Sequence, residues 1–339
     1  MSSHGPAGGS AGPEELGRLG LTREALLNML SKMLEIRKFE EKVEELFLVK
    51  GLLTGPSHLY YGQEAVAVGV LSALRQDDKV VTTYRCHGHA LARGVSVEAL
   101  MAELFGRATG TCKGLGGSMH AAISLEHGIP VATAIVGSGL PIAAGLALAL
   151  RYRKSDALVA CFFGDGAVNT GAFHEALNIC SLWRLPVLFV CENNYYAEFT
   201  PLRASLAAGS ITSRAASYGM ATARVFGNDV IEVYRAAAEA ARRIRAGEGP
   251  YFLECETYRR GGHGVYDKAT YRPKEEVERW LSKDPIELFK SRLSSWGLLD
   301  ADWLSEVEGD IERRLERAVQ EAQSAPLVPF EQLGDFVYA

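Results

Sequence analysis

The chain has 339 residues, of which 47 % are hydrophobic and 23 % are charged. This is an ordinary globular composition, and the length suits one large α/β domain or two medium ones. A net charge of -5 leaves no basic footprint for nucleic acid, and the longest apolar stretch is too short to span a membrane.

Residues 1–20 lack the basic start and apolar centre of a secretory signal, and their Gly, Ser and Pro content predicts a disordered segment. The six cysteines are scattered without a CxxC pair, which is typical of core thiols in a reducing compartment. We therefore expect a cytoplasmic protein with one α/β domain over residues 21–325 and a C-terminal tail over residues 326–339.

The first predicted elements are read from the spacing of apolar residues. Residues 22–50 have helical spacing, and we interpret Glu40, Glu41, Glu44 and Glu45 as the solvated face of this helix, without chemistry. The elements that follow are a helix, a strand, a helix and a glycine-rich loop, at residues 62–75, 78–85, 96–106 and 110–120. A helix with small residues at 143–149 comes next.

The best-defined unit is a strand, a helix and a second strand, at residues 157–164, 169–183 and 186–193. Both strands are apolar throughout, which predicts a parallel sheet with helices on both faces. A second such unit follows, with strands at 221–227 and 250–258 around a helix that begins near Asp229.

Residues 259–273 form a glycine-rich loop in this scheme, and residues 274–325 are mainly helical. The sequence therefore predicts an α/β fold built on a parallel sheet, with a helical C-terminal segment.

Polar residues follow two neighbouring strands of this sheet. Asp165 lies between Gly164 and Gly166 directly after the first strand, and Asn194 follows the second. Ligands of parallel sheets bind beyond the carboxyl ends of the strands, so a carboxylate and a carboxamide are expected to face one crevice. Both are hard oxygen donors of the kind that Mg²⁺ takes together with phosphate, and the two glycines allow backbone to approach a bulky anion.

Two other interpretations compete with a metal site here. Each motif taken alone is more simply a turn, but their placement after consecutive buried strands weakens that interpretation. A Rossmann dinucleotide site would need a GxGxxG after an early strand, which the sequence lacks. A helix terminus offers only about half a positive charge, so Asp165 would repel a diphosphate unless a divalent cation lies between them.

The stretch from Gly164 to Asn194 is similar to the thiamine-diphosphate motif, which opens with Gly-Asp-Gly and closes with Asn-Asn. More narrowly, the chain resembles the alpha subunit of the decarboxylating component of 2-oxo acid dehydrogenase complexes, a family with pyruvate, branched-chain and acetoin members. The resemblance extends from about Ile36 to Tyr271 and includes HLYYGQEAVAVG, TYRCHGHALARG, AELFGRATGTCKGLGGSMH, IVGSGLPIAAGLALA and YRRGGHGVYD.

This resemblance implies the thiamine-diphosphate-binding fold, with thiamine diphosphate and Mg²⁺ as cofactors. The implied metal ligands are the side chains of Asp165 and Asn194 and the carbonyl of Tyr196. The implied cofactor-binding residues are Tyr84, Arg85, Val136, Gly164, Asp165, Gly166, Ala167, Asn194, Tyr196 and His263. The implied catalytic residues are His263, in a mobile loop, and His120.

Some residues depart from the family pattern or stand outside it. Leu115 replaces a lysine, Ala134 a glycine, Gly261 a histidine, and Gly264 a serine that is phosphorylated in mitochondrial members. His87 and His89 form an HxH without a third zinc ligand at suitable spacing, so we interpret them as hydrogen-bonding residues near the active-site entrance. Glu64 matches an alpha-subunit motif and is interpreted as structural.

The glutamate that activates the cofactor in this family lies on a separate beta subunit, so the resemblance implies an α₂β₂ heterotetramer. The implied activity is cleavage of a carbon–carbon bond next to a carbonyl, in a 2-oxo acid or acetoin, with transfer of the acyl or hydroxyalkyl group to a lipoyl acyltransferase. A stand-alone carboligase that forms acyloins is the alternative, and a non-catalytic cofactor-binding subunit is a third. The substrate itself stays open.

Overall fold

The structure is a computed structural model that describes residues 16–17 and 19–337. The disordered segment predicted for residues 1–20 therefore lies mostly outside the described residues. Of its described residues, Leu16 is buried and packs in the main hydrophobic core. The domain limits at residues 21 and 325 stay a prediction.

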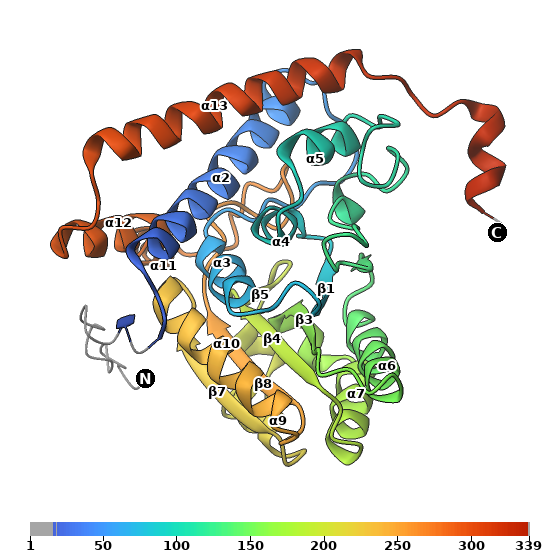
Figure 1. The fold of residues 1–339 in the computed structure, drawn as a ribbon, viewed down its shortest axis with the longest axis vertical. Helices are drawn as coiled ribbons and strands as arrows, with labels where there is room; N and C mark the ends of the chain where they lie inside the picture. The colour runs from blue at the N-terminus through green and yellow to red at the C-terminus, as the bar shows by residue number, and fades with distance from the viewer. Residues whose placement is uncertain (1–15, 18, 338–339) are drawn as a thin grey trace.

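A six-stranded sheet forms the centre of the molecule, in the order β2-β1-β3-β4-β8-β7, and all its neighbouring strands are parallel (Figure 1). The strands are β1 (Lys79–Thr83), β2 (Val131–Thr133), β3 (Val159–Gly164), β4 (Val187–Asn193), β7 (Ala221–Phe226) and β8 (Tyr251–Glu256). A separate antiparallel hairpin joins β5 (Tyr196–Ala197) and β6 (Thr200–Pro201). The parallel sheet predicted from the apolar runs is confirmed.

Two hydrophobic clusters cover the two faces of this sheet, because successive residues of each strand point to opposite faces. Phe162 and Val190 belong to one cluster, and Phe163 and Phe189 belong to the other. Helix α10 (Val230–Arg245) packs on the first face, and its cluster extends to α2 (Arg23–Leu48), α3 (Glu64–Ser72), α4 (His87–Arg93) and α5 (Val97–Leu104). The second is covered by α6 (Gly139–Tyr152), α7 (Gly171–Leu182) and α9 (Ile211–Ala216).

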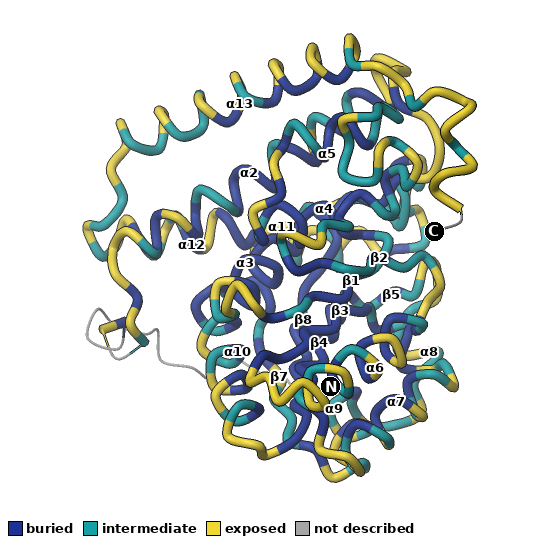
Figure 2. Tube along the Cα trace, turned by 45° about the vertical axis from the view of Figure 1, so that its right-hand side comes forward, coloured by how far each residue is buried: buried dark blue, intermediate teal, exposed yellow. Residues whose placement is uncertain are grey.

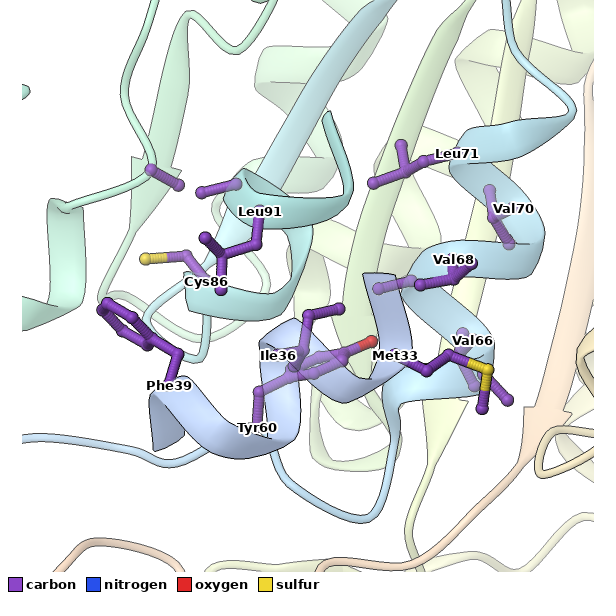
Figure 3. Packing of buried hydrophobic residues seen from close by; sticks show 14 of the residues in the cluster. Met33, Ile36, Phe39, Tyr60, Val66, Val68, Val70, Leu71, Cys86 and Leu91 are labelled. Carbon is purple, nitrogen blue, oxygen red and sulfur yellow. The ribbon is translucent and has the colours of Figure 1, made fainter. Parts of the chain in front are cut away.

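Helix α2 lies inside the first layer and not at its surface. Thr22 caps its N-terminus by accepting a hydrogen bond from Ala25 N at 3.1 Å. Figure 3 shows Met33, Ile36 and Phe39 of α2 in one cluster with side chains of α3 and α4. The interpretation of Glu40 as part of a solvated face is wrong, because this side chain is fully buried and accepts a hydrogen bond from Tyr60 N at 3.0 Å.

The C-terminal part is helical, as the sequence predicts, with α11 (Lys274–Leu281), α12 (Pro285–Ser295) and α13 (Ala301–Ser324). Helix α13 lies along α2 at one end of the molecule and keeps its outer face exposed (Figures 1 and 2). Ion pairs join the two helices, such as Lys38 with Glu312 at 2.9 Å; at this exposure each contributes about 0–1 kcal/mol. No helix among residues 16–17 and 19–337 is long and apolar enough to cross a membrane.

Candidate active site

A cavity of about 360 Å³ opens where the parallel strands end. Its walls come from the segments that follow β1, β2, β3, β4 and β8. All ten residues predicted to bind the cofactor line it: Tyr84, Arg85, Val136, Gly164, Asp165, Gly166, Ala167, Asn194, Tyr196 and His263. The structure therefore brings together residues up to 179 positions apart (84 to 263), and their individual roles stay predictions.

The turn after β3 places Asp165 in this cavity. The chain leaves the strand in a short 3₁₀ helix (Asp165–Asn169), and α7 starts after Thr170, which accepts a hydrogen bond from Phe173 N at 3.3 Å. At Gly166 a Cβ atom would lie 2.8 Å from Cβ of Ala197, so a side chain there would push the β5–β6 hairpin away. Glycine at 166 lets the backbone of this turn lie against the hairpin.

The carboxylate of Asp165 is the least satisfied acidic group in the cavity. The residue is 1 % exposed, and its Oδ2 has no hydrogen-bond partner among the described residues. Burial raises the pKa of Asp165 to about 6. Buried polar atoms are nearly always paired in proteins, so this oxygen is suited to receive a cation or a donor from a bound group.

Asn194 is held in the same wall by contacts on both sides. Its Nδ2 donates to Oε1 of Gln63 at 3.1 Å, and its Oδ1 lies 3.4 Å from Tyr196 N. The preceding Asn193 donates from Nδ2 to Oε1 of Glu254 at 2.8 Å and accepts from Tyr195 N at 3.1 Å. These bonds hold Tyr195 in the left-handed region, at φ 69°, and bring Asn194 and Tyr196 to the cavity.

The buried guanidinium groups of Arg85 and Arg259 give one wall of the cavity a positive charge. Arg85 donates to the carbonyl oxygens of Leu59 at 2.6 Å and of His263 at 2.9 Å. Burial and the neighbouring Arg259 lower the pKa of Arg85 to about 10, which still leaves it charged at neutral pH. Arg259 donates to the carbonyl oxygen of Glu198 at 3.2 Å and to Oη of Tyr271 at 3.4 Å. Among the described residues neither arginine is paired with a carboxylate, so both charges are available to a bound anion.

Two neutral histidines stand beside these arginines. The ring of His263 lies 4.8 Å from the ring of His58 and 5.6 Å from that of Tyr84, measured between centroids. Burial, with repulsion from Arg85, lowers the pKa of His263 to about 4 and that of His58 to about 3. Each ring can therefore donate one hydrogen bond and accept another at neutral pH.

His120 lies apart from this group. Its Nδ1 donates to the carbonyl oxygen of Ala132 at 2.6 Å, which ties the ring to β2, and the cavity is lined by the adjacent Met119 instead. The catalytic role of His120 stays a prediction.

The HxH pair is also differently placed from what the sequence suggests. His87 and His89 are fully buried rather than at an entrance. Nδ1 of His87 lies 3.0 Å from Oε2 of Glu40, and Nδ1 of His89 lies 2.7 Å from Oγ1 of Thr82. The expected hydrogen bonding is present, but helix α4 packs both rings into the interior.

The positions that depart from the family pattern have different surroundings. Ala134 lines the cavity, whereas Leu115 is exposed. A Cβ atom at Gly261 would lie 2.6 Å from Oη of Tyr61, and one at Gly264 would lie 3.3 Å from the carbonyl oxygen of Ser57. Glu64 accepts a hydrogen bond from Nε of Arg37 at 2.6 Å, so its structural interpretation agrees with a buried ion pair.

The cavity residues that sequence reasoning did not find include His58, Gln63 and Arg259. His58 and Gln63 belong to the motif HLYYGQEAVAVG, and Arg259 belongs to YRRGGHGVYD. These motifs could therefore have indicated all three residues. Their side-chain directions depend on contacts across the fold.

Comparison with known proteins gives one consistent result. The family model described as "Dehydrogenase E1 component" matches residues 31–331. Over 94 % of this chain and 95 % of the relative, the chain is 47 % identical to the alpha subunit of acetoin:2,6-dichlorophenolindophenol oxidoreductase of Bacillus subtilis. It is 44 % identical to the pyruvate dehydrogenase E1 component subunit alpha of Zymomonas mobilis, over 94 % of this chain and 89 % of the relative. The corresponding subunit of Rhizobium meliloti is 43 % identical, over 90 % and 87 %.

Proposed function

This chain belongs to the dehydrogenase E1 component family, and from that premise we propose that it is the alpha subunit of a thiamine-diphosphate-dependent 2-oxo acid or acetoin dehydrogenase. The observation that carries the proposal is the unpaired buried Oδ2 of Asp165, facing the same cavity as Asn194 and the cationic Arg85 and Arg259. A divalent cation and a polyanion would together satisfy these groups.

Thiamine diphosphate and Mg²⁺ fit the residues that are present. Among the described residues, no cluster of three His, Cys, Asp or Glu side chains could hold a metal by itself. A site built from one carboxylate, one carboxamide and one backbone carbonyl instead leaves coordination positions for phosphate oxygens, as Mg²⁺ commonly uses. Asp165, Asn194 and the carbonyl of Tyr196 would hold the metal, and the backbone at Gly166 and Ala167 would meet the diphosphate.

The chain's own residues would have distinct tasks in the reaction. Bound thiamine diphosphate supplies a nucleophilic carbon and an electron sink for the bond next to a carbonyl. Arg85 and Arg259 would neutralise the diphosphate. The neutral rings of His263 and His58 would hold or move protons near the substrate, and Leu140 and Phe162 would help to exclude water. Val136 would support the aminopyrimidine ring.

The proposal includes a partner chain. The relatives are named as alpha subunits, and a beta subunit that carries the activating glutamate would complete the site in an α₂β₂ heterotetramer. Transfer of the acyl or hydroxyalkyl group to a lipoyl acyltransferase, and a cytoplasmic location, are further parts of the proposal. The names dehydrogenase and oxidoreductase count against the stand-alone carboligase.

The test is made on the assembled protein of this chain and its beta subunit. We expect reduction of ferricyanide or of a lipoyl domain with pyruvate or acetoin, without any added carbonyl acceptor. Activity that requires a second carbonyl and yields only acyloins would support the carboligase instead. Asp165→Ala should abolish Mg²⁺-dependent binding of thiamine diphosphate, and unchanged binding would contradict the metal site.

A further inference from the structure

Gln63 occupies an unusual place for a buried amide. It directly precedes α3 and stands at the N-cap position, yet its side chain makes no capping hydrogen bond. The residue is 1 % exposed and lines the cavity. The preceding Gly62 has φ 100°, and a Cβ atom there would lie 2.4 Å from the carbonyl oxygen of Tyr258. This close approach to the segment after β8 directs the side chain of Gln63 into the cavity instead of along its helix.

The oxygen of Gln63 controls the orientation of Asn194. Oε1 accepts the hydrogen bond from Nδ2 of Asn194 at 3.1 Å, across 131 residues of sequence. If the amide of Asn194 were rotated by half a turn, two carbonyl-type oxygens would face each other without a proton between them. On the other side of the amide, Oδ1 of Asn194 lies 3.4 Å from Tyr196 N, so this contact and the bond to Gln63 together hold Nδ2 toward Gln63.

The nitrogen of Gln63 has nothing to bind among the described residues. Nε2 is buried without a hydrogen-bond partner, and so is Oδ2 of Asp165 in the same cavity. An unsatisfied buried donor or acceptor is unfavourable, so a cavity that contains both an unpaired acceptor and an unpaired donor is suited to a ligand with both features. A divalent cation matches the acceptor, and an oxygen bound to that cation matches the donor.

We propose that Gln63 is a positioning residue for the metal ligand Asn194 and a hydrogen-bond donor to an oxygen of the bound metal–diphosphate group. The inference rests on the proposed function, because it assumes that this cavity holds a divalent cation with a diphosphate. The proposal predicts that the oxygen and the nitrogen of the Gln63 amide affect two different binding affinities. The acceptor end governs the affinity for the metal, and the donor end governs the affinity for the diphosphate at saturating metal.

Two variants distinguish the acceptor role of Gln63 from its donor role, and both are measured in the assembled protein after the cofactor has been removed. Gln63→Leu removes both ends at similar size, whereas Gln63→Glu keeps the acceptor for Asn194 and removes the donor. Calorimetric titration gives the Mg²⁺ concentration for half-maximal thiamine diphosphate binding, and the cofactor affinity at saturating Mg²⁺. In Gln63→Leu the half-saturating Mg²⁺ concentration should rise about 10–100-fold, as for other partners of metal ligands.

In Gln63→Glu the half-saturating Mg²⁺ concentration should not rise, because the acceptor for Asn194 stays and the added negative charge attracts the cation. At saturating Mg²⁺, Gln63→Leu should lose about tenfold in cofactor affinity, and Gln63→Glu at least as much, because its carboxylate also repels the diphosphate. Asn228→Leu is the matched control, because this buried amide is paired at both ends and does not line the cavity. It should lower stability and leave both affinities unchanged. If Gln63→Leu does not assemble, Gln63→Met, which also lacks both the donor and the acceptor, takes its place in the comparison.

The outcomes separate this inference from the function on which it rests. If Asp165→Ala abolishes Mg²⁺-dependent binding while both Gln63 variants titrate like the parent protein, the role of Gln63 is overturned and the proposed function stands. An equal rise of the half-saturating Mg²⁺ concentration in Gln63→Glu and Gln63→Leu would overturn the acceptor role. Unchanged binding in Asp165→Ala would contradict the metal site itself.

Discussion

Glu103 and Asp165 are both buried carboxylates beside glycine-rich turns, and they differ in what surrounds them. Glu103 is fully buried and accepts four backbone hydrogen bonds at 2.8–3.0 Å, from Cys112, Gly114, Gly116 and Gly117. Asp165 has an oxygen with no partner among the described residues. The first carboxylate therefore holds a loop together, and the second is available to a ligand.

The same contrast holds for the other buried polar groups. Among the described residues, eight buried side-chain atoms lack a hydrogen-bond partner, and four of them belong to cavity residues: His58, Gln63, Asp165 and Arg259. By contrast, the buried Glu40 and Glu64 have partners from the protein. Unpaired polar atoms that converge on one cavity mark the place of a bound group, whereas paired ones stabilise the fold.

The largest expected effect comes from a substitution of Glu103, the carboxylate that stabilises the fold. Glu103→Gln replaces an acceptor oxygen by an amide that cannot accept, so two backbone N–H groups lose their partner. We expect the free energy of unfolding to fall by about 2–6 kcal/mol. Denaturant titration of the cofactor-free protein measures this loss. An unchanged midpoint would show that the 110–117 loop does not depend on Glu103.

A second prediction concerns Asp165 and the pH dependence of cofactor binding. Because the pKa of Asp165 is raised to about 6, protons would compete with the proposed Mg²⁺ below that pH. Affinity for Mg²⁺ with thiamine diphosphate should fall about tenfold per pH unit below about 6 and level off above it. Calorimetry at several pH values tests this. A flat profile between pH 5 and 7 would mean that Asp165 does not carry the metal.

A smaller effect is expected at Gly261, near the cavity but outside its lining. Gly261→His would press against Oη of Tyr61, which donates to Glu44 at 3.0 Å. Loss of this half-buried hydrogen bond should cost about 1 kcal/mol of stability, and cofactor affinity should change little. Denaturant titration and calorimetry measure the two quantities. A large loss of cofactor affinity would place this loop position in the binding site.

The fold is largely predictable from apolar runs, whereas parts of the site are not. The strands near 157–164 and 186–193 are predictable because both of their faces are buried, while the three residues of β2 are too few to show a period. Helical spacing does not reveal that α2 is covered by other helices on more than one side, so Glu40 is wrongly expected in solvent. Gln63 meets Asn194 only through the fold, which no local pattern encodes.

The most direct test of the central claim is Asp165→Asn in the cofactor-free protein. The raised pKa of Asp165 means that its carboxyl costs no stability below the unfolded-state value of 3.8, and that stability is lost as the pH rises through about 6. A neutral isostere should therefore raise the free energy of unfolding by about 1–3 kcal/mol at pH 8, with little gain near pH 4.

If Asp165 holds the proposed Mg²⁺, the same variant should lose Mg²⁺-dependent binding of thiamine diphosphate by at least about 100-fold, since the proposed site would lose its carboxylate ligand. Denaturant titration at both pH values, together with calorimetry of the assembled protein, gives both results. A more stable protein that no longer binds the cofactor is the predicted outcome. A destabilised protein that still binds thiamine diphosphate with Mg²⁺ would contradict the account.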